Sequence, residues 1–441
     1  MKTILLKDGQ VGHHLGIYDA DVLIGADGKI VDTYDWGKKI KADKVIDCKG
    51  KLILPGLIDV HVHFREPGES YKETWETGSK AAVSSGVTTV FDMPNNKPPI
   101  LSVKDLKAKR KLISGRSYCN YGLYTGFDGE NFSEIAKMKG VVGVKIYSAN
   151  STGDMGVNMK VIEKLLKKYK GMVVVHAEDS ACVRENSEKY LAEFADRDAE
   201  FSIHSKIRSP KCAIAAVKSV CESAKKTGHK KLHIAHVSCE GEIDVINKYR
   251  DFGVTCEVTP HHLLLCDGDY ENPGNFIKVN PPVRSREDVF AMWKALKFGD
   301  IDMIATDHAP HSVVEKEQEY RKAPAGVPEL DTFLPVLLNA VNDEALEISE
   351  IVKLCCENPA KVFGLAEKGQ VEPGFDADLV VVDMDLEKKV DAKNLFTKCG
   401  WSPYTGVKLK GWPVMTFVGG ELVFKNGKIV GKPQGKEVKF D

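Results

Sequence analysis

Two histidines separated by one residue mark the part of the sequence where chemistry is most plainly encoded. His61 and His63 stand in the stretch 54–68, LPGLIDVHVHFREPG, which begins as an apolar run and ends in a loop punctuated by glycine and proline. Successive side chains of a strand point to opposite faces, so these two imidazoles share one face. Two imidazoles on one face can bind a divalent metal, but the pair alone does not distinguish a metal site from two unrelated histidines.

Further candidate ligands follow other apolar segments. Each of four more expected strand ends carries one such residue: Lys145, His176, His236 and Asp307. At a strand end, a lone histidine is more often structural and a lone aspartate more often caps a turn. Independent structural roles nevertheless explain poorly why six such residues all stand at expected strand ends. Imidazole and carboxylate without cysteine suit a catalytic Zn²⁺ site that keeps one position open, with Mn²⁺, Fe²⁺ or Co²⁺ as alternatives.

Lys145 differs from the other candidates because it is an amine within an apolar strand, GVKIY at 143–147. Burying a charged amine without a partner is costly, and burial lowers the pKa of a lysine until it is neutral and nucleophilic. A neutral amine can add CO₂ to form a carbamate, a carboxylate long enough to bridge two metals. The alternative is a lysine that is salt-bridged or reaches solvent with its ammonium group.

Apolar strands alternate with helical segments between about residues 54 and 364, which is typical of repeated βα units. The eight expected strands cover 56–63, 87–92, 118–123, 141–147, 172–176, 232–237, 254–258 and 303–307. This pattern favours an α/β fold, a closed (β/α)₈ TIM-like barrel, although an open doubly wound sheet would give a similar pattern. In a barrel, catalytic residues lie at the C-terminal strand ends, where the candidate ligands stand.

The terminal segments have a different texture, with short β-like runs separated by hairpin turns such as Ala26–Gly28 and Asn426–Gly427. The N-terminal segment is too short to bury a core alone. We therefore expect residues 1–53 and 365–441 to pair into one composite β-sandwich domain that flanks a catalytic barrel formed by 54–364.

Composition excludes several classes of protein. The 441 residues are 43% apolar with a net charge of −1, and no basic stripe suggests nucleic-acid binding. No apolar run is long enough for a membrane span, and charge interrupts the first residues too early for a signal peptide. The 11 cysteines include no C-x-x-C pair and lie mostly in apolar segments. They predict reduced, buried thiols and a cytoplasmic protein.

Taken together, the strand-end motifs resemble those of the amidohydrolase superfamily, and within it the dihydroorotases. The resemblance covers essentially the whole chain. It rests on DVHVHFREPG at 59–68, DMPNN at 92–96, GVKIY at 143–147, HAED at 176–179, IAHVS at 234–238, NPPVR at 280–284 and ATDHAPH at 305–311.

The resemblance implies reversible cyclisation of N-carbamoyl-L-aspartate to (S)-dihydroorotate, a step of de novo pyrimidine (UMP) synthesis, with two Zn²⁺ ions that activate a water. It implies that one ion is held by His61, His63 and Asp307, the other by His176 and His236, with carboxylated Lys145 bridging both. Some bacterial dihydroorotases use an aspartate after the fourth strand as the bridge. Asp154 is therefore a rival to Lys145, although Lys145 stands on the strand and Asp154 in the loop.

The resemblance also implies roles for residues beyond the ligands. Asp307 would transfer the proton, and Arg65 would grip a substrate carboxylate in a bidentate fork. Asn95 and His311 would assist Arg65, and Asn280 would contact the ring amide. The alternatives are a surface ion pair for Arg65 and a turn position for Asn95.

Hydantoinase/dihydropyrimidinase and allantoinase share this metal site and are the alternative activities. Arg65, Asn95 and His311 favour a substrate with a free carboxylate, which hydantoins and allantoin lack. A non-catalytic scaffold homologue would be expected to lose ligands, and all six are present. The expected partner is the small-molecule substrate, not nucleic acid or membrane. The number and identity of the metals and the oligomeric state, a homodimer included, stay open.

Overall fold

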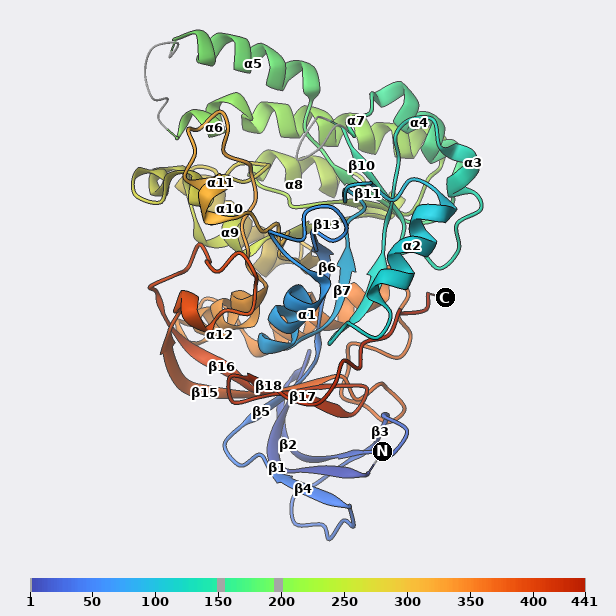
Figure 1. Cartoon of the computed structure of the whole chain (residues 1–441), viewed down its shortest axis with the longest axis vertical. Helices are drawn as coiled ribbons and strands as arrows, with labels where there is room; N and C mark the ends of the chain where they lie inside the picture. The colour runs from blue at the N-terminus through green and yellow to red at the C-terminus, as the bar shows by residue number, and fades with distance from the viewer. Residues whose placement is uncertain (1, 149–154, 194–200, 441) are drawn as a thin grey trace.

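A barrel of parallel strands forms the centre of the chain in the computed structural model, which describes residues 2–148, 155–193 and 201–440 (Figure 1). Its eight strands are β6 (Leu57–Val62), β7 (Val87–Asp92), β8 (Asn120–Leu123), β10 (Val144–Tyr147), β11 (Val173–His176), β12 (Leu232–Ile234), β13 (Val254–Val258) and β14 (Met303–Ile304). All eight fall within the expected ranges.

The strands pair in parallel in sequence order and close on themselves. Strands β6, β7 and β8 form one sheet, and β10 to β14 form another with the short β9 (Thr125–Gly126) at its edge. The N–H of Val142 donates to the carbonyl of Leu123 on one side, and a parallel bridge joins Val62 to His308 on the other. These contacts connect the two sheets, so the expected (β/α)₈ barrel is confirmed.

Two strands end earlier than the sequence predicts. The expected strands 232–237 and 303–307 stop at Ile234 and Ile304. Shortly beyond them His236 and Asp307 have positive φ angles of 39° and 47°. Left-handed backbone cannot continue a strand, so both candidate ligands stand just past the regular ladder instead of within it.

Helices follow the strands and surround the barrel. The α-helices are α1 (Trp75–Ser84), α2 (Val103–Ile113), α3 (Phe132–Ile135), α4 (Met159–Lys168), α5 (Ser180–Glu193), α6 (Ile203–Ile207), α7 (Pro210–Thr227), α8 (Glu240–Asn247), α9 (Pro260–Leu264), α10 (Arg286–Phe298), α11 (Val313–Lys316), α12 (Phe333–Asn342), α13 (Ile348–Val352) and α14 (Asn358–Phe363). A π-helical turn, Lys353–Glu357, joins α13 to α14. Within the described ranges, none of these helices combines the length and apolar character of a bilayer span.

Both ends of the chain contribute to one β-sheet beside the barrel, seen as blue and red strands at one end of the molecule (Figure 1). Its strands are β1 (Ile4–His13), β2 (Gly16–Ile24), β3 (Ile30–Tyr34), β4 (Lys44–Asp47), β5 (Leu52–Pro55), β15 (Leu379–Lys389), β16 (Lys408–Val418), β17 (Glu421–Lys425) and β18 (Lys428–Ile429). Strand β5 pairs with both β1 and β15 and so joins the two halves.

The composite β unit has a core of its own, in which apolar side chains of both terminal segments, Val11 and Phe417 among them, form one buried cluster. The composite arrangement is therefore confirmed. Its strands are not all antiparallel, since β1 runs parallel to β4 and β5.

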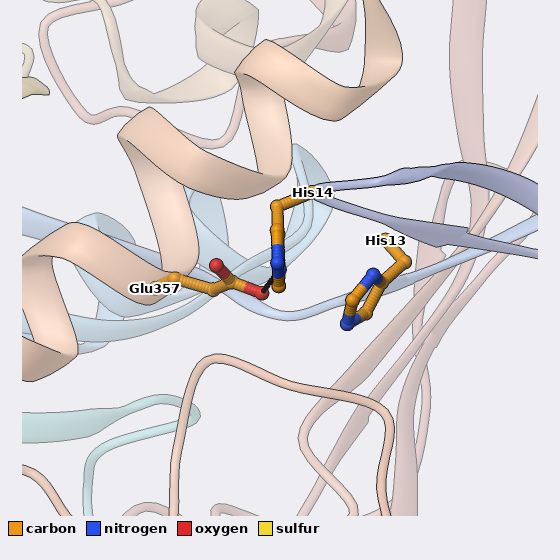
Figure 2. A group of neighbouring side chains, drawn as sticks. All are labelled: His13, His14 and Glu357. Atoms are coloured by element: carbon orange, nitrogen blue, oxygen red, sulfur yellow. Dashed lines mark hydrogen bonds and ion pairs between the residues drawn. The ribbon is translucent and has the colours of Figure 1, made fainter.

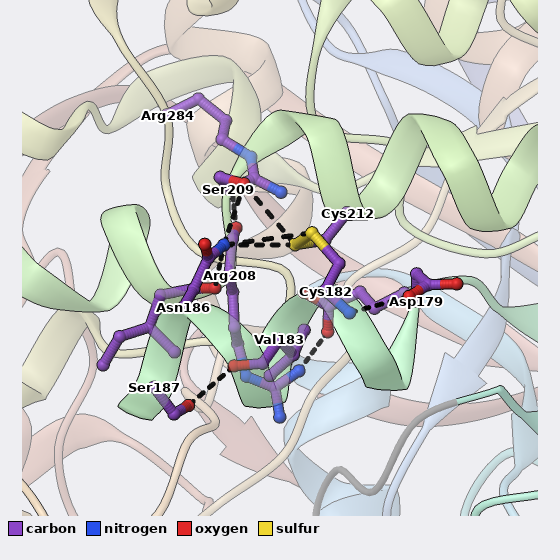
Figure 3. The surroundings of a disulfide bond; sticks show 11 residues. Asp179, Cys182, Val183, Asn186, Ser187, Arg208, Ser209, Cys212 and Arg284 are labelled. Atoms are coloured by element: carbon purple, nitrogen blue, oxygen red, sulfur yellow. Dashed lines mark hydrogen bonds and ion pairs between the residues drawn. A yellow bond between two sulfur atoms is a disulfide. The ribbon is translucent and has the colours of Figure 1, made fainter. Parts of the chain in front are cut away.

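The prediction that all cysteines are reduced is wrong for one pair. Cys182 on α5 and Cys212 on α7 form a disulfide (Figure 3). The two residues are 30 positions apart, and only the packing of α5 beside α7 brings them together, so their spacing carries no signal. The other nine cysteines are free, and eight of these are buried as expected.

Candidate functional site

A pocket at the C-terminal ends of the barrel strands contains nearly all of the predicted site residues. It is lined by His61, His63, Arg65, Asn95, Lys145, Tyr147, His176, His236, Asn280, Asp307, Ala309, Ala325 and Gly326. His311 is the one predicted site residue that does not line it. The rival bridge Asp154 lies outside the described residues.

Two histidines and one aspartate meet on the first side of the pocket. Nε2 of His63 lies 2.9 Å from Oδ1 of Asp307, and Nε2 of His61 lies 3.3 Å from the same oxygen. The donor atoms of all three side chains lie within 4.8 Å of one another, and all three residues are buried. The first predicted ligand group is thus assembled.

The second group faces the first across the pocket. Nδ1 of His176 lies 2.9 Å from Nε2 of His236, and the ring centroids of His61 and His236 are 5.4 Å apart. Nζ of Lys145 lies 3.5 Å from Nε2 of His61. The lysine therefore stands beside the first group and lines the same pocket as the second.

Three of the four imidazoles are oriented by an acceptor outside the cluster. Nδ1 of His61 contacts the carboxylate of Glu257, Nδ1 of His63 lies 2.7 Å from Oδ1 of Asn95, and Nε2 of His176 lies 2.9 Å from a carboxylate oxygen of Glu178. An acceptor at one ring nitrogen fixes the proton there and leaves the lone pair on the other nitrogen. In each ring that other nitrogen faces the cluster.

The electrostatics keep three of the imidazoles neutral, those of His61, His176 and His236. Burial lowers the pKa of His61 to about 4, with a further contribution from Lys145. Burial also lowers the pKa of His176 and places that of His236 well below its usual range. Neutral imidazole is the form that binds metals.

One polar group of the pocket lacks a partner, and another has a single long contact. Among the residues that the structure describes, Nδ1 of His236 is buried without a hydrogen-bond acceptor or donor. Lys145 is fully buried, its nearest polar contact is His61, and it forms no ion pair with a described carboxylate. Unpaired buried polar groups are costly. Together with the three oriented lone pairs, they fit a site for divalent metal.

Sequence reasoning missed the residues that orient the candidate ligands. Glu257 lies on β13 with one carboxylate oxygen against His61 and the other 3.0 Å from Nε2 of His233. Glu178 pairs with Arg208 behind His176. The available signal was a glutamate inside the apolar strand VTCEV at 254–258, since an isolated carboxylate there needs partners.

Replacing Glu257 by glutamine tests its role. The amide keeps the volume but loses the charge that orients His61, so we expect metal affinity or kcat/KM to fall by about 10- to 100-fold. Titration of metal-stripped enzyme with Zn²⁺, followed by activity, measures the change. Raising free Zn²⁺ should restore part of the activity, and unchanged metal affinity would contradict the assignment.

Arg65 brings a buried cation to the same pocket. It is 3% exposed, its Nε donates to the carbonyl of Pro310 at 3.1 Å, and its Nη2 lies 3.1 Å from Nε2 of His311. No described carboxylate forms an ion pair with it, so the surface ion pair considered for Arg65 is not what the structure has. His311 stands behind Arg65, where burial and the charge of Arg65 hold the pKa of His311 well below its usual range.

The two predicted asparagines are fixed from opposite sides. Asn95 contacts His63, while Oδ1 of Asn280 lies 2.9 Å from Nε2 of His204. His204 on α6 is buried, and its Nδ1 lies 2.8 Å from the hydroxyl of Tyr320. A chain from Tyr320 through His204 to Asn280 thus sets the side of Asn280 that faces the pocket. No pattern in the sequence indicates these contacts.

Comparison with known proteins agrees with this arrangement. Residues 52–423 match the model of the amidohydrolase family. The chain belongs to the amidohydrolase family. Two dihydroorotases are similar to this amidohydrolase over most of their length. The protein from Pyrococcus horikoshii is 42% identical over 91% of this chain and 88% of its own, and that from Methanosarcina acetivorans is 36% identical over 98% and 94%.

Among solved structures, this amidohydrolase is similar to the L-hydantoinase (dihydropyrimidinase) from Arthrobacter aurescens. The two share 30% identity and superpose with a TM-score of 0.95 over 100% of both chains. The relatives confirm the resemblance to dihydroorotases and a hydrolytic enzyme. Both groups of relatives have this fold, so the choice of substrate depends on the residues around the ligands.

Proposed function

We propose that this amidohydrolase is a dihydroorotase that interconverts N-carbamoyl-L-aspartate and (S)-dihydroorotate. The observation that carries the proposal is Arg65, a buried guanidinium that lines the same pocket as the ligand cluster and forms no ion pair with any carboxylate of the described residues. Desolvating a cation is costly unless an anion joins it. A substrate carboxylate supplies that anion, and both N-carbamoyl-L-aspartate and dihydroorotate carry one.

His61, His63, His176, His236 and Asp307 would hold two zinc ions, with carboxylated Lys145 between them. Bound metal of this kind lowers the pKa of water and polarises the carbonyl under attack. The Lys145 side chain suits the modification because burial lowers its pKa to about 8, which leaves a sizeable neutral fraction near neutral pH.

Asp307 would transfer the proton between the substrate nitrogen and the leaving oxygen, because it is the only carboxylate among the described residues that line the pocket. In ring closure the carbamoyl nitrogen loses a proton as its bond to the carboxylate carbon forms. One carboxylate oxygen leaves as water, which carries this proton, passed on by Asp307, and a second proton from solvent. In ring opening Asp307 returns a proton to the departing nitrogen.

The other pocket residues orient the substrate. Arg65 would pair with its carboxylate from the His311 side, with Asn95 beside it. Asn280, held by His204, would contact the ring amide. Hydantoins and allantoin offer Arg65 no carboxylate, so the hydantoinase alternative leaves its charge buried and uncompensated.

Replacing Arg65 by lysine is expected to lower kcat/KM for dihydroorotate by about 10-fold or more, because the charge remains but the bidentate fork is lost. Replacing Arg65 by methionine should lower kcat/KM further, because it removes a charged hydrogen bond that contributes about 1.5–3 kcal/mol. Steady-state assays of both variants with dihydroorotate, hydantoin and allantoin measure the effect, beside metal analysis of each variant.

Metal content should not change in either variant, because Arg65 lies outside the ligand cluster. Hydrolysis of a ring without a carboxylate should be nearly indifferent to both substitutions. If wild-type enzyme turned over hydantoin faster than dihydroorotate, or if both variants lost all activities equally, the hydantoinase alternative would replace our proposal.

A further inference from the structure

A second group of histidines and carboxylates lies at the opposite end of the barrel. His13 ends β1, His14 stands in the tight turn before β2, and Glu357 is the last residue of the π-helical turn (Figure 2). The π-turn contacts the N-terminal sides of the barrel strands: Cys356 lies 3.5 Å from the carbonyl of Pro55, just before β6. Catalytic residues stand at the C-terminal ends, so this group is separate from them.

The side chains converge from three parts of the chain. Nδ1 of His14 lies 2.7 Å from Oε1 of Glu357, and the ring centroids of His13 and His14 are 4.0 Å apart. One donor atom from each of the three residues lies within 4.8 Å of the others. Nε2 of His13 also lies 3.8 Å from Oε1 of Glu372, which adds a second carboxylate at the edge of the group.

We infer that His13, His14 and Glu357, with Glu372 at the edge, bind one divalent transition-metal ion such as Zn²⁺. Imidazole nitrogen and carboxylate oxygen are the donors that Zn²⁺ takes, and the two carboxylates supply the charge to balance a dication. The side chains of His14 and Glu357 are 36% and 15% exposed, so an ion can enter from solvent.

A metal here would add a link between two parts of the fold. The hairpin of β1 and β2 belongs to the composite β unit, while the π-helical turn packs against the N-terminal ends of the barrel strands. The His14–Glu357 contact is partly exposed, and exposed ion pairs contribute little to stability. An ion held by both parts would clamp the hairpin to the barrel and stabilise the folded state by mass action.

Zinc-loaded enzyme dialysed against buffered free Zn²⁺ tests the inference. The matched variant is His14→Gln/Glu357→Gln, which keeps side-chain volume but removes an imidazole and a carboxylate. Wild type should bind one Zn²⁺ per chain more than the variant, whatever the catalytic pocket holds. With free Zn²⁺ about 100-fold above the dissociation constant, the melting temperature of wild type should rise by about 3 °C and that of the variant should not.

A control variant removes a carboxylate elsewhere. Glu367 is 67% exposed, pairs with Lys29 and lies outside the group, so Glu367→Gln should behave as wild type. Activity of all three proteins should be equal, since none of these residues touches the catalytic pocket. If the double variant does not fold, His14→Gln alone replaces it. Equal metal content and equal thermal response in wild type and variant would overturn the inference, leaving adventitious binding only.

Discussion

Alanine in place of Lys145 is expected to reduce kcat/KM for dihydroorotate by about 1,000-fold or more. Loss of several kcal/mol of charge stabilisation by metal at the reacting carbonyl has this effect on the rate. We expect acetate or propionate to restore part of the activity, because a small carboxylic acid can enter the space that the side chain leaves and supply the missing carboxylate.

The physical reason lies in the charge of the pocket. Its described lining contains one carboxylate, Asp307, against several neutral imidazoles. Two dications need more negative charge than one carboxylate supplies. Lys145 is fully buried and forms no ion pair with a described carboxylate. Addition of CO₂ to its neutral amine, with loss of a proton, provides an anion at that point.

Three measurements separate this account from its rivals. Lys145→Gln keeps the volume without the carboxylate and should be as impaired as Lys145→Ala. Carbon NMR of enzyme prepared with ¹³C-bicarbonate should show a carbamate signal in wild type alone. If active holoenzyme contained unmodified Lys145 and the Asp154→Asn variant were inactive, Asp154 and not Lys145 would be the bridging residue.

The barrel was predictable from the sequence because its strands are short apolar runs with turn residues at each end. Candidate ligands at several strand ends also predicted the pocket, since the barrel brings all C-terminal strand ends together. The sequence pattern did not predict the residues at which strands β12 and β14 end. His236 and Asp307 leave the ladder by adopting positive φ, which neither residue type enforces by itself.

The residues behind the ligands were not predictable because their partners are distant in the sequence. Glu257 contacts His61, which is 196 positions away in the sequence, and Asn280 contacts His204, which is 76 positions away. The disulfide between Cys182 and Cys212 likewise depends on how two helices pack. Local pattern identifies groups that need a partner, and the fold alone determines which partner they find.

Replacing His236 by asparagine is expected to abolish activity and to lower the metal content of the enzyme. His236 stands between the two halves of the pocket, 2.9 Å from His176 and with Nδ1 buried and unpartnered among the described residues. Asparagine tolerates positive φ and so preserves the backbone at this position, whereas alanine should lose the same metal and also lower the melting temperature.

His262→Asn is the matched control, because His262 is buried beside the same barrel but bonds to Thr259 and the carbonyl of Pro281 outside the pocket. Its metal content should equal that of wild type. Removing metal from wild-type enzyme with a chelator should reproduce the loss of activity expected for His236→Asn. Adding Zn²⁺ back should restore the activity of the wild-type enzyme but not that of the variant. Full activity in metal-stripped enzyme would contradict the proposal, because the four histidines that converge in the pocket would then be structural and not metal ligands.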